Sequence, residues 1–309
     1  MNSVAIDGTQ MGSLRHPASR SRAGRLVDID SAQFLLNYNR RPFVFTHRLH
    51  EHRLLQFDSL VALANRLPWD QVRYCRGKTS FATNFDQALR ERGHALSVQE
   101  LLDDMQNSDA YVLLFQTNTD PEYDQLFDDV LVDLQPLLDK LDPGAMIWRA
   151  ASIFIASPSA ITPYHMDREM NFLCQVRGTK DVQLWDQDDR TIMSQEAIER
   201  VYACPGERKP TYQPEFAAKA QHFTLGPGLG VHQPLMAPHA VQNGNEPSIA
   251  IAFTYRTKWS QTRALANAFN HRMRTRGFHP REVGQKPWVD RVKASALGAY
   301  LAARGRDLG

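Results

Sequence analysis

The sequence has few cysteines, little net charge and no long apolar run. Its three cysteines, Cys75, Cys174 and Cys204, lie far apart among 309 residues and show no C-x-x-C spacing. This pattern argues against a disulfide framework and against a structural zinc site. Because free thiols persist in reducing compartments, we expect a cytoplasmic protein.

The charge balance and hydropathy also exclude classes of partner. The formal net charge is +2, with 36 Lys and Arg against 34 Asp and Glu, so the molecule as a whole presents no strong field to nucleic acid or a membrane. No run approaches the roughly 20 apolar residues of a membrane span. The N-terminus also lacks the apolar core of a signal peptide. We therefore expect no membrane partner.

The first half of the chain reads as two segments. Residues 1–25 are rich in Ser, Gly and Arg, which predicts a flexible basic arm. Residues 26–145 predict an α/β region, because short apolar runs alternate with helical apolar spacing. The expected elements are strands over 42–45 and 110–115, a helix capped by Asp58, a helix opened by a capping box at Ser97, and a helix over 123–141.

From Met146 the pattern changes from helical to extended. About eight short strands are predicted in residues 146–258, and a long insert, 187–220, interrupts them with a helix over 194–201. Asn243-Gly244 predicts a hairpin that leads into the last strand, residues 248–256. This pattern predicts a mainly β fold with flanking α elements. Its core would be a double-stranded β-helix, the jelly-roll architecture that includes cupins.

The tail, residues 259–309, returns to helical spacing. One apolar stripe contains Leu265, Phe269 and Met273, and another contains Trp288, Val292, Ala296 and Tyr300. Ten Lys and Arg against three Asp and Glu give the tail a local charge of about +7. Nucleic-acid binding is one interpretation of this charge. We favour a helix pair whose apolar face forms a homodimer.

The candidate metal ligands are His165, Asp167 and His239. His165 and Asp167 are two positions apart near the end of a predicted strand, so both side chains would point to the same face. His239 precedes a later strand of the same predicted barrel. Two imidazoles and one carboxylate bind one side of a metal ion and leave the other side open, as in non-haem Fe(II) oxygenases.

Two other interpretations of these residues remain open. His232 lies seven residues before His239 and could be the second imidazole, or it could be a polar strand residue. His165 and Asp167 could also form a buried hydrogen-bonded pair without a metal. Redox and isomerase cupins commonly offer three histidines and a glutamate, but Asp167 stands where their second histidine would lie.

These residues resemble the JmjC/cupin-like Fe(II)- and 2-oxoglutarate-dependent oxygenases. The resemblance covers about 146–256 and is greatest to the branch that contains the hypoxia-inducible-factor asparaginyl hydroxylase and bacterial cupin-like relatives. It rests on residues 162–167 (Thr-Pro-Tyr-His-Met-Asp), Asn171-Phe172, Gln175, Gly178 and Lys180. It implies Fe(II), 2-oxoglutarate and O2 as cofactor and cosubstrates.

The resemblance also implies contacts to 2-oxoglutarate. Thr162 and Lys180 match the positions that bind its distal carboxylate, Asn171 would lie against it, and Thr254 stands where the hydroxylase has an Asn. Lys180 shares a strand face with Val182 and Leu184, so its ammonium would point into an apolar interior and need an anion. Alternatively, Lys180 flanks the turn and stays solvated.

By this resemblance we expect an enzyme that hydroxylates a C–H bond and releases succinate and CO2. Its substrate would be a protein or peptide side chain or a small metabolite. N-methyl-lysine demethylation would share the chemistry. The competing hypothesis is a non-catalytic cupin-like module that binds metal or ligand as a regulator.

Overall fold

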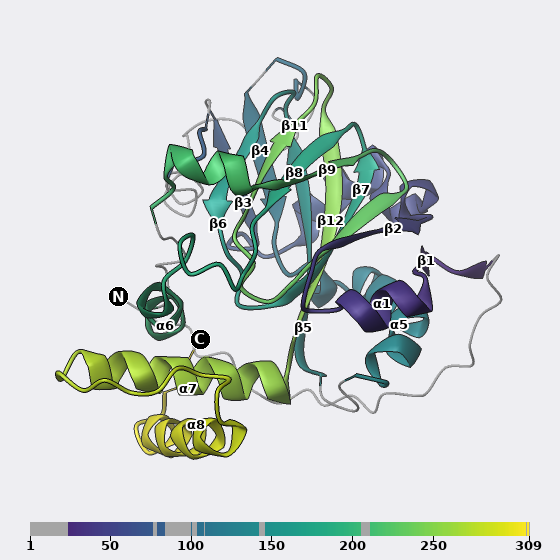
Figure 1. The fold of residues 1–309 in the computed structure, drawn as a ribbon. Coiled ribbons are helices and arrows are strands. Elements are labelled where there is room, and N and C mark those ends of the chain that lie inside the picture. Colours follow the sequence, from purple (N-terminus) through teal and green to yellow (C-terminus); the bar gives the residue numbers. More distant parts are fainter. Residues whose placement is uncertain are drawn as a thin grey trace.

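A computed structural model describes residues 24–76, 79–83, 100, 104–107, 109–141, 146–204, 211–306 and 308. Two antiparallel sheets face each other, with helices around them (Figure 1). In sheet order, the larger sheet contains β1 (Val27–Asp28), β2 (Phe43–His47), β10 (Leu229–Gln233), β7 (Met170–Arg177), β12 (Ser248–Thr257), β5 (Met146–Ala156), β4 (Ala110–Leu114) and β3 (Val72–Arg76). The smaller contains β6 (Ile161–His165), β11 (His239–Asn243), β8 (Lys180–Leu184) and β9 (Gln221–Leu225).

The eight strands β5 to β12 pass back and forth between the two sheets, as in a jelly roll. The predicted fold class, mainly β with flanking helices, is therefore confirmed. Along β12 the predicted alternation holds: Ala250 and Ala252 lie between the sheets, whereas Ile251 and Phe253 face outward. The other inward side chains between the sheets are also mainly aliphatic, including Leu173, Val182, Leu184, Leu225 and Val231.

Helices cover the outer face of the larger sheet. Phe127 of α5 (Pro121–Leu138) packs against Phe253 of β12 with ring centroids 5.0 Å apart, which attaches the helix to the sheet. The helices and 3-10 turns of this N-terminal part are α1 (Ser31–Asn37), η2 (Leu49–Glu51), η3 (Arg53–Leu55), α2 (Phe57–Arg66), η4 (Thr117–Thr119) and α5 (Pro121–Leu138).

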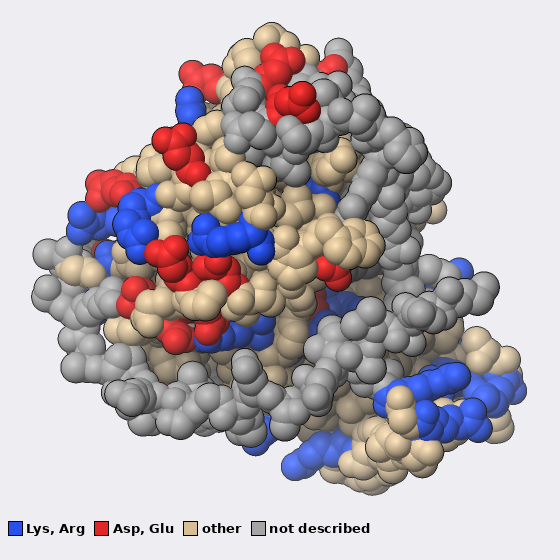
Figure 2. Space-filling model, turned by 180° about the vertical axis from the view of Figure 1, so that it is seen from behind, with Lys and Arg blue, Asp and Glu red and all other residues tan. Residues whose placement is uncertain are grey.

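Three helices lie beneath the barrel in Figure 1. The insert contributes α6 (Gln195–Ala203), and the tail contributes α7 (Lys258–Arg274) and α8 (Pro287–Ala302). The insert also contains the 3-10 turn η5 (Pro214–Lys219), which directly precedes β9. α7 follows β12 directly and contacts both α6 and α8. The stripe predicted on α8 lies outward, with Trp288 63% and Val292 60% exposed. Figure 2 shows basic side chains gathered over this part of the molecule.

Two local predictions were wrong. Asn243-Gly244 does not form a hairpin, because β11 pairs with β6 and β8 whereas β12 pairs with β5 and β7. The chain crosses between the sheets there, and a Cβ at Gly244 would lie 2.1 Å from the Thr179 hydroxyl. Asp58 is in the first turn of α2 rather than at its N-cap, which is Gln56. The predicted arm up to residue 23 and the capping box at Ser97 lie outside the described residues.

No helix in the described part of the chain is long and apolar enough to cross a bilayer.

Candidate metal centre

His165, Asp167 and His239 converge at one end of the barrel. His165 ends β6 and His239 begins β11, and the two residues are direct partners across these antiparallel strands. The nearest Asp167 oxygens lie 4.0 Å from Nε2 of His165 and 3.8 Å from Nε2 of His239. The three ligand atoms all lie within 4.8 Å of one another, as donors around one ion would.

Main-chain carbonyls orient both imidazoles. Nδ1 of His165 lies 2.7 Å from the carbonyl oxygen of Pro163, and Nδ1 of His239 lies 3.0 Å from that of Ala237. A carbonyl oxygen only accepts hydrogen bonds, so each Nδ1 carries the proton and each Nε2 presents a lone pair toward Asp167. This outer arrangement is typical of metal-binding histidines.

A bulge in β6 lets Thr162 share the inner face with His165. The register shifts on β11 between His239, which pairs with His165, and Val241, which pairs with Thr162. Three positions therefore separate two side chains that face the same way, which regular alternation forbids. Thr162 is buried, and its hydroxyl lies 3.0 Å from that of Tyr111 on β4.

Lys180 lies deeper in the barrel and is almost fully buried, at 3% exposure. Lys180 pairs with Asn243 of β11. Asn243 lies four residues after His239, so the Cα positions of His239 and Asn243 are about 13 Å apart along the strand. Within the described residues, its ammonium has no hydrogen bond or ion pair. Burial lowers the pKa of Lys180 to about 8. The alternative of a solvated lysine at the turn is wrong.

Asn171 and Thr254 are partners on β7 and β12. The Asn171 side-chain amide donates through Nδ2 to Oε1 of Gln233 at 2.9 Å, but its buried side-chain oxygen Oδ1 has no hydrogen-bond partner in the part of the chain that the structure describes. The Thr254 hydroxyl donates to the carbonyl oxygen of Ala150 at 3.0 Å. Thr254 is thus already engaged by its own sheet, whereas Asn171 retains an unused acceptor.

His232 lies in a different environment from the three converging residues. It packs outside the barrel interior against Phe172, with ring centroids 4.7 Å apart. Its Nε2 accepts a hydrogen bond from the main-chain N–H of Asn39 at 3.1 Å, and its Nδ1 lies 3.1 Å from the main-chain carbonyl oxygen of Asn171. Burial lowers its pKa to about 3, so it stays neutral. His232 is a core histidine with both nitrogens occupied.

Tyr111 and Gln233 were not among the residues predicted for the site. Tyr111 reaches it through the Thr162 hydroxyl, and Gln233 reaches it through the Asn171 amide. Burial raises the pKa of Tyr111 far above its ordinary value, so its hydroxyl stays protonated. Both residues lie on strands distant in sequence, so no local spacing could have linked them to the site.

The donor set suits a divalent transition metal. Two neutral imidazoles and one carboxylate on one side leave the remaining coordination positions to other ligands, which is the arrangement of non-haem Fe(II) sites. The buried Lys180 ammonium and the unused Asn171 oxygen offer polar partners to a molecule bound beside the metal. These residues therefore fit a metal together with an anionic cosubstrate.

Comparison with known proteins agrees with the architecture. A family model described as a cupin-like domain matches residues 38–261, more than two thirds of the chain. No curated protein matches the sequence. An X-ray structure of E. coli ycfD has a TM-score of 0.52 at 16% identity, over 89% of this chain and 68% of that chain.

A structure described as YcfD, a ribosomal oxygenase from Escherichia coli, in complex with cobalt and 2-oxoglutarate has a TM-score of 0.46 at 14% identity. It covers 89% of this chain and 67% of that chain. At such low identity, the likeness to solved structures shows the fold alone. The family match, together with the two-sheet jelly roll, confirms the cupin resemblance: this chain belongs to the cupin-like domain family.

Proposed function

We propose that this chain is an Fe(II)- and 2-oxoglutarate-dependent oxygenase that hydroxylates a C–H bond of a protein or peptide side chain or a small metabolite. The observation that carries the proposal is the convergence of His165, Asp167 and His239 where β6 ends and β11 begins in the jelly roll. The fold shared with E. coli ycfD supports a scaffold suited to this chemistry.

The three converging residues would hold the iron. His165 and His239 would bind through Nε2, because their Nδ1 atoms are held by main-chain carbonyls, and Asp167 would bind through its carboxylate. When bound, the iron and 2-oxoglutarate supply the oxidising chemistry that consumes O2 and releases succinate and CO2 with the product. The protein would contribute ligand geometry, orientation and a shielded interior.

Lys180 would bind the distal carboxylate of 2-oxoglutarate. Its buried ammonium needs an anion, and the described residues contain no carboxylate partner for it. Thr162 and Tyr111 would add hydroxyl groups to that carboxylate, and Asn171 would lie beside the cosubstrate. The separation of about 13 Å between the strand positions of His239 and Lys180 leaves room for a linear dicarboxylate between metal and ammonium.

The test measures both metal binding and turnover. We expect the wild-type chain with Fe(II) to release succinate from 2-oxoglutarate in air and to bind Co(II) with visible d–d absorption. His165→Ala should abolish both. His222→Ala is the matched control, because His222 is an exposed histidine of β9 that lies beside Asp181, and it should change neither.

The possible outcomes separate the competing functions. Co(II) binding at His165 without 2-oxoglutarate turnover would support the non-catalytic cupin-like module instead. Absence of both would refute the proposal. Formaldehyde release from an N-methylated substrate would indicate demethylation rather than stable hydroxylation.

We also propose a homodimer formed through the C-terminal helices. The outward stripe of α8 supports it, since Trp288, Val292 and Tyr300 are all more than two-fifths exposed. Large exposed apolar side chains grouped on one face mark interaction surfaces. Light scattering after size exclusion should give twice the chain mass, and Val292→Glu should give the monomer mass.

A further inference from the structure

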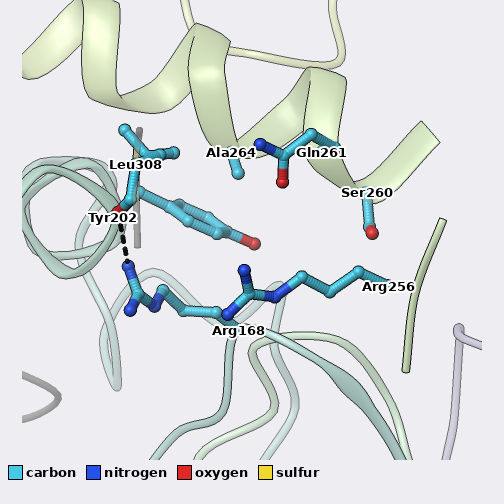
Figure 3. A pocket seen from close by; sticks show the side chains of 7 residues that line it. All are labelled: Arg168, Tyr202, Arg256, Ser260, Gln261, Ala264 and Leu308. Carbon is cyan, nitrogen blue, oxygen red and sulfur yellow. Dashed lines mark hydrogen bonds between the residues drawn. The ribbon is translucent and has the colours of Figure 1, made fainter. Parts of the chain in front are cut away.

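The structure has cavities of very different size. The one drawn in Figure 3, between the barrel and the helices α6 and α7, has a volume of about 10 Å3, so nothing larger than one water molecule fits. A second cavity has a volume of about 240 Å3. We call it the arginine pocket, because its lining includes Arg40 and Arg41, together with Asp186, Gln221 and Pro234.

The strand register puts the arginine pocket at the level of the metal ligands. His165, His239, Leu184 and Gln221 are aligned across the four strands of the smaller sheet, so their side chains lie on the same face. Leu184 faces the interior between the sheets, and this is therefore also the face of Gln221. Neighbouring strands lie about 4.8 Å apart, so Gln221 is about 10 Å from His239 across the sheet.

The turn that carries the two arginines is anchored at three points. Asn39 directly precedes them and has a left-handed backbone, with φ +54°. Its main-chain N–H donates to Nε2 of His232 at 3.1 Å, and its side-chain oxygen accepts the main-chain N–H of Leu235 at 2.7 Å. Its carbonyl oxygen accepts the Gln187 side-chain amide at 3.0 Å. The turn is thus ordered before a ligand binds, which lowers the entropic cost of binding.

The two guanidinium groups are available to a ligand. Within the described residues, the side chains of Arg40 and Arg41 make no hydrogen bond or ion pair, and both are exposed. The only carboxylate in the lining of the pocket belongs to Asp186, and its Oδ1 accepts the main-chain N–H of Asp188 at 2.8 Å. Guanidinium groups only donate hydrogen bonds, and their forked geometry matches the two oxygens of a carboxylate.

The pocket suits one side chain of a peptide rather than a whole small molecule. Its volume is below the roughly 300–1,000 Å3 of pockets that enclose a small ligand. Arg40, Asp186 and Gln221 are exposed, so the pocket is open to solvent and a bound chain continues over the surface. An extended peptide advances about 3.3 Å per residue, so three residues cover the roughly 10 Å to His239.

We infer that the arginine pocket binds a Glu or Asp side chain of a peptide substrate, about three residues away from the residue that enters the metal centre. Only the word substrate rests on the proposed oxygenase function. The docking site itself rests on the cavity, its two unpaired arginines and the anchored turn that carries them.

The first test measures binding to the metal-free full chain. The probe is a peptide of two adjacent glutamates flanked on each side by three alanines, carries a neutral dye, and is followed by fluorescence anisotropy. We expect saturable binding that weakens as salt is added. Arg40→Gln combined with Arg41→Gln should weaken it about tenfold, because two exposed ion pairs are lost.

Two controls accompany this measurement. Arg177→Gln should leave the binding curve unchanged, because Arg177 is an exposed arginine at the end of β7 that is distant from Asn171. The same peptide with glutamine in place of both glutamates should not bind. Equal affinity of the wild type and the double variant would overturn the proposal. Tighter binding of a single-stranded oligonucleotide through the same arginines would overturn the acidic peptide as the occupant.

The second test measures position. With Mn(II) at the metal centre, the methyl resonance of the outermost alanine on one side of the glutamates should broaden more than those of the alanines next to them, because broadening falls steeply with distance. The double variant should lose this difference. Equal broadening of all the alanines in the wild type would overturn the three-residue spacing.

Neither readout requires O2 or turnover. Normal peptide binding without succinate release would remove the oxygenase proposal and leave the docking site. Normal succinate release without peptide binding would do the reverse.

Discussion

His165 and His239 face each other across two adjacent strands, with ring centroids 4.1 Å apart and an angle of 52° between the rings. Each imidazole is held through Nδ1 by the carbonyl oxygen two residues before it in the chain. The backbone therefore sets the tautomer and orientation of both rings, and substitutions of neighbouring side chains should leave these two hydrogen bonds intact. The side chains around the site can then be tested one at a time.

Lys180→Met should weaken binding of 2-oxoglutarate about 10- to 100-fold. A hydrogen bond to a charged group contributes about 1.5–3 kcal/mol, and each 1.4 kcal/mol is a tenfold change in affinity. Calorimetric titration of 2-oxoglutarate into the Zn(II)-loaded chain would measure the change. Lys140→Met, at an exposed lysine beyond α5, should bind like the wild type. Equal affinity in Lys180→Met would show that another group binds the distal carboxylate.

The same substitution should stabilise the ligand-free protein at neutral pH. Burial lowers the pKa of Lys180 from 10.5 to about 8, so the folded state binds this proton less readily than the unfolded state. The cost is fully present below pH 8 and vanishes as the pH rises through 10.5, because both states are then neutral. Its size is on the order of 3 kcal/mol.

Urea unfolding at pH 7 and at pH 10.5 would check this. Lys180→Met should be more stable than the wild type at pH 7, and the difference should shrink at pH 10.5. A constant difference across this pH range would contradict the burial cost.

Glu199→Gln should destabilise the protein by about 2–3 kcal/mol. The Glu199 carboxylate is fully buried and accepts Nε of Arg274 at 2.6 Å and the Asn270 amide at 3.1 Å, which joins α6 to α7. Glu196→Gln is the matched control on the same helix. Glu196 is 63% exposed, and its carboxylate lies 3.6 Å from the Arg274 guanidinium, farther than that of Glu199. It should change stability by less than about 0.5 kcal/mol in urea unfolding.

Gly178→Ala should cost about 2 kcal/mol or more, measured by the midpoint of urea unfolding. Gly178 has φ +69°, and a Cβ there would lie 2.6 Å from the main-chain oxygen of Pro247. At Gly226 a Cβ would meet nothing within 4 Å, so Gly226→Ala should be close to neutral. Equal effects of the two substitutions would mean that the crossing between β7 and β8 relaxes around the new methyl group.

The strand pattern was predictable because it is local. β5 occupies Met146–Ala156 as expected, and Lys180 faces the apolar interior together with Val182 and Leu184. Alternation along one strand depends only on backbone geometry, so neighbouring residues suffice to read it. The same rule offered His165 and Asp167 as a candidate ligand pair, although β6 ends at His165 and Asp167 lies just beyond the strand.

Sheet pairing was not predictable in the same way. Asn243-Gly244 has the composition of a hairpin turn. In the structure, the chain crosses between the two sheets here, and only a residue without a Cβ leaves room for the Thr179 side chain beside it. Composition reports that a turn occurs there. It does not tell which strands β11 and β12, on either side of the turn, pair with, because that pairing depends on residues far away in the sequence.

The sequence by itself determined the period of each strand and the His165–Asp167 pair as candidate ligands, because side-chain alternation acts over a few residues. It left open whether Lys180 is buried or solvated, which the structure decided. Only the tertiary structure decided between His239 and His232 and brought Tyr111 to Thr162. It also brought the turn that carries Arg40 and Arg41 next to the end of β8 and the start of β9. These relationships join strands and helices widely separated along the chain, and the packing of the two sheets and the C-terminal helices sets which of them meet.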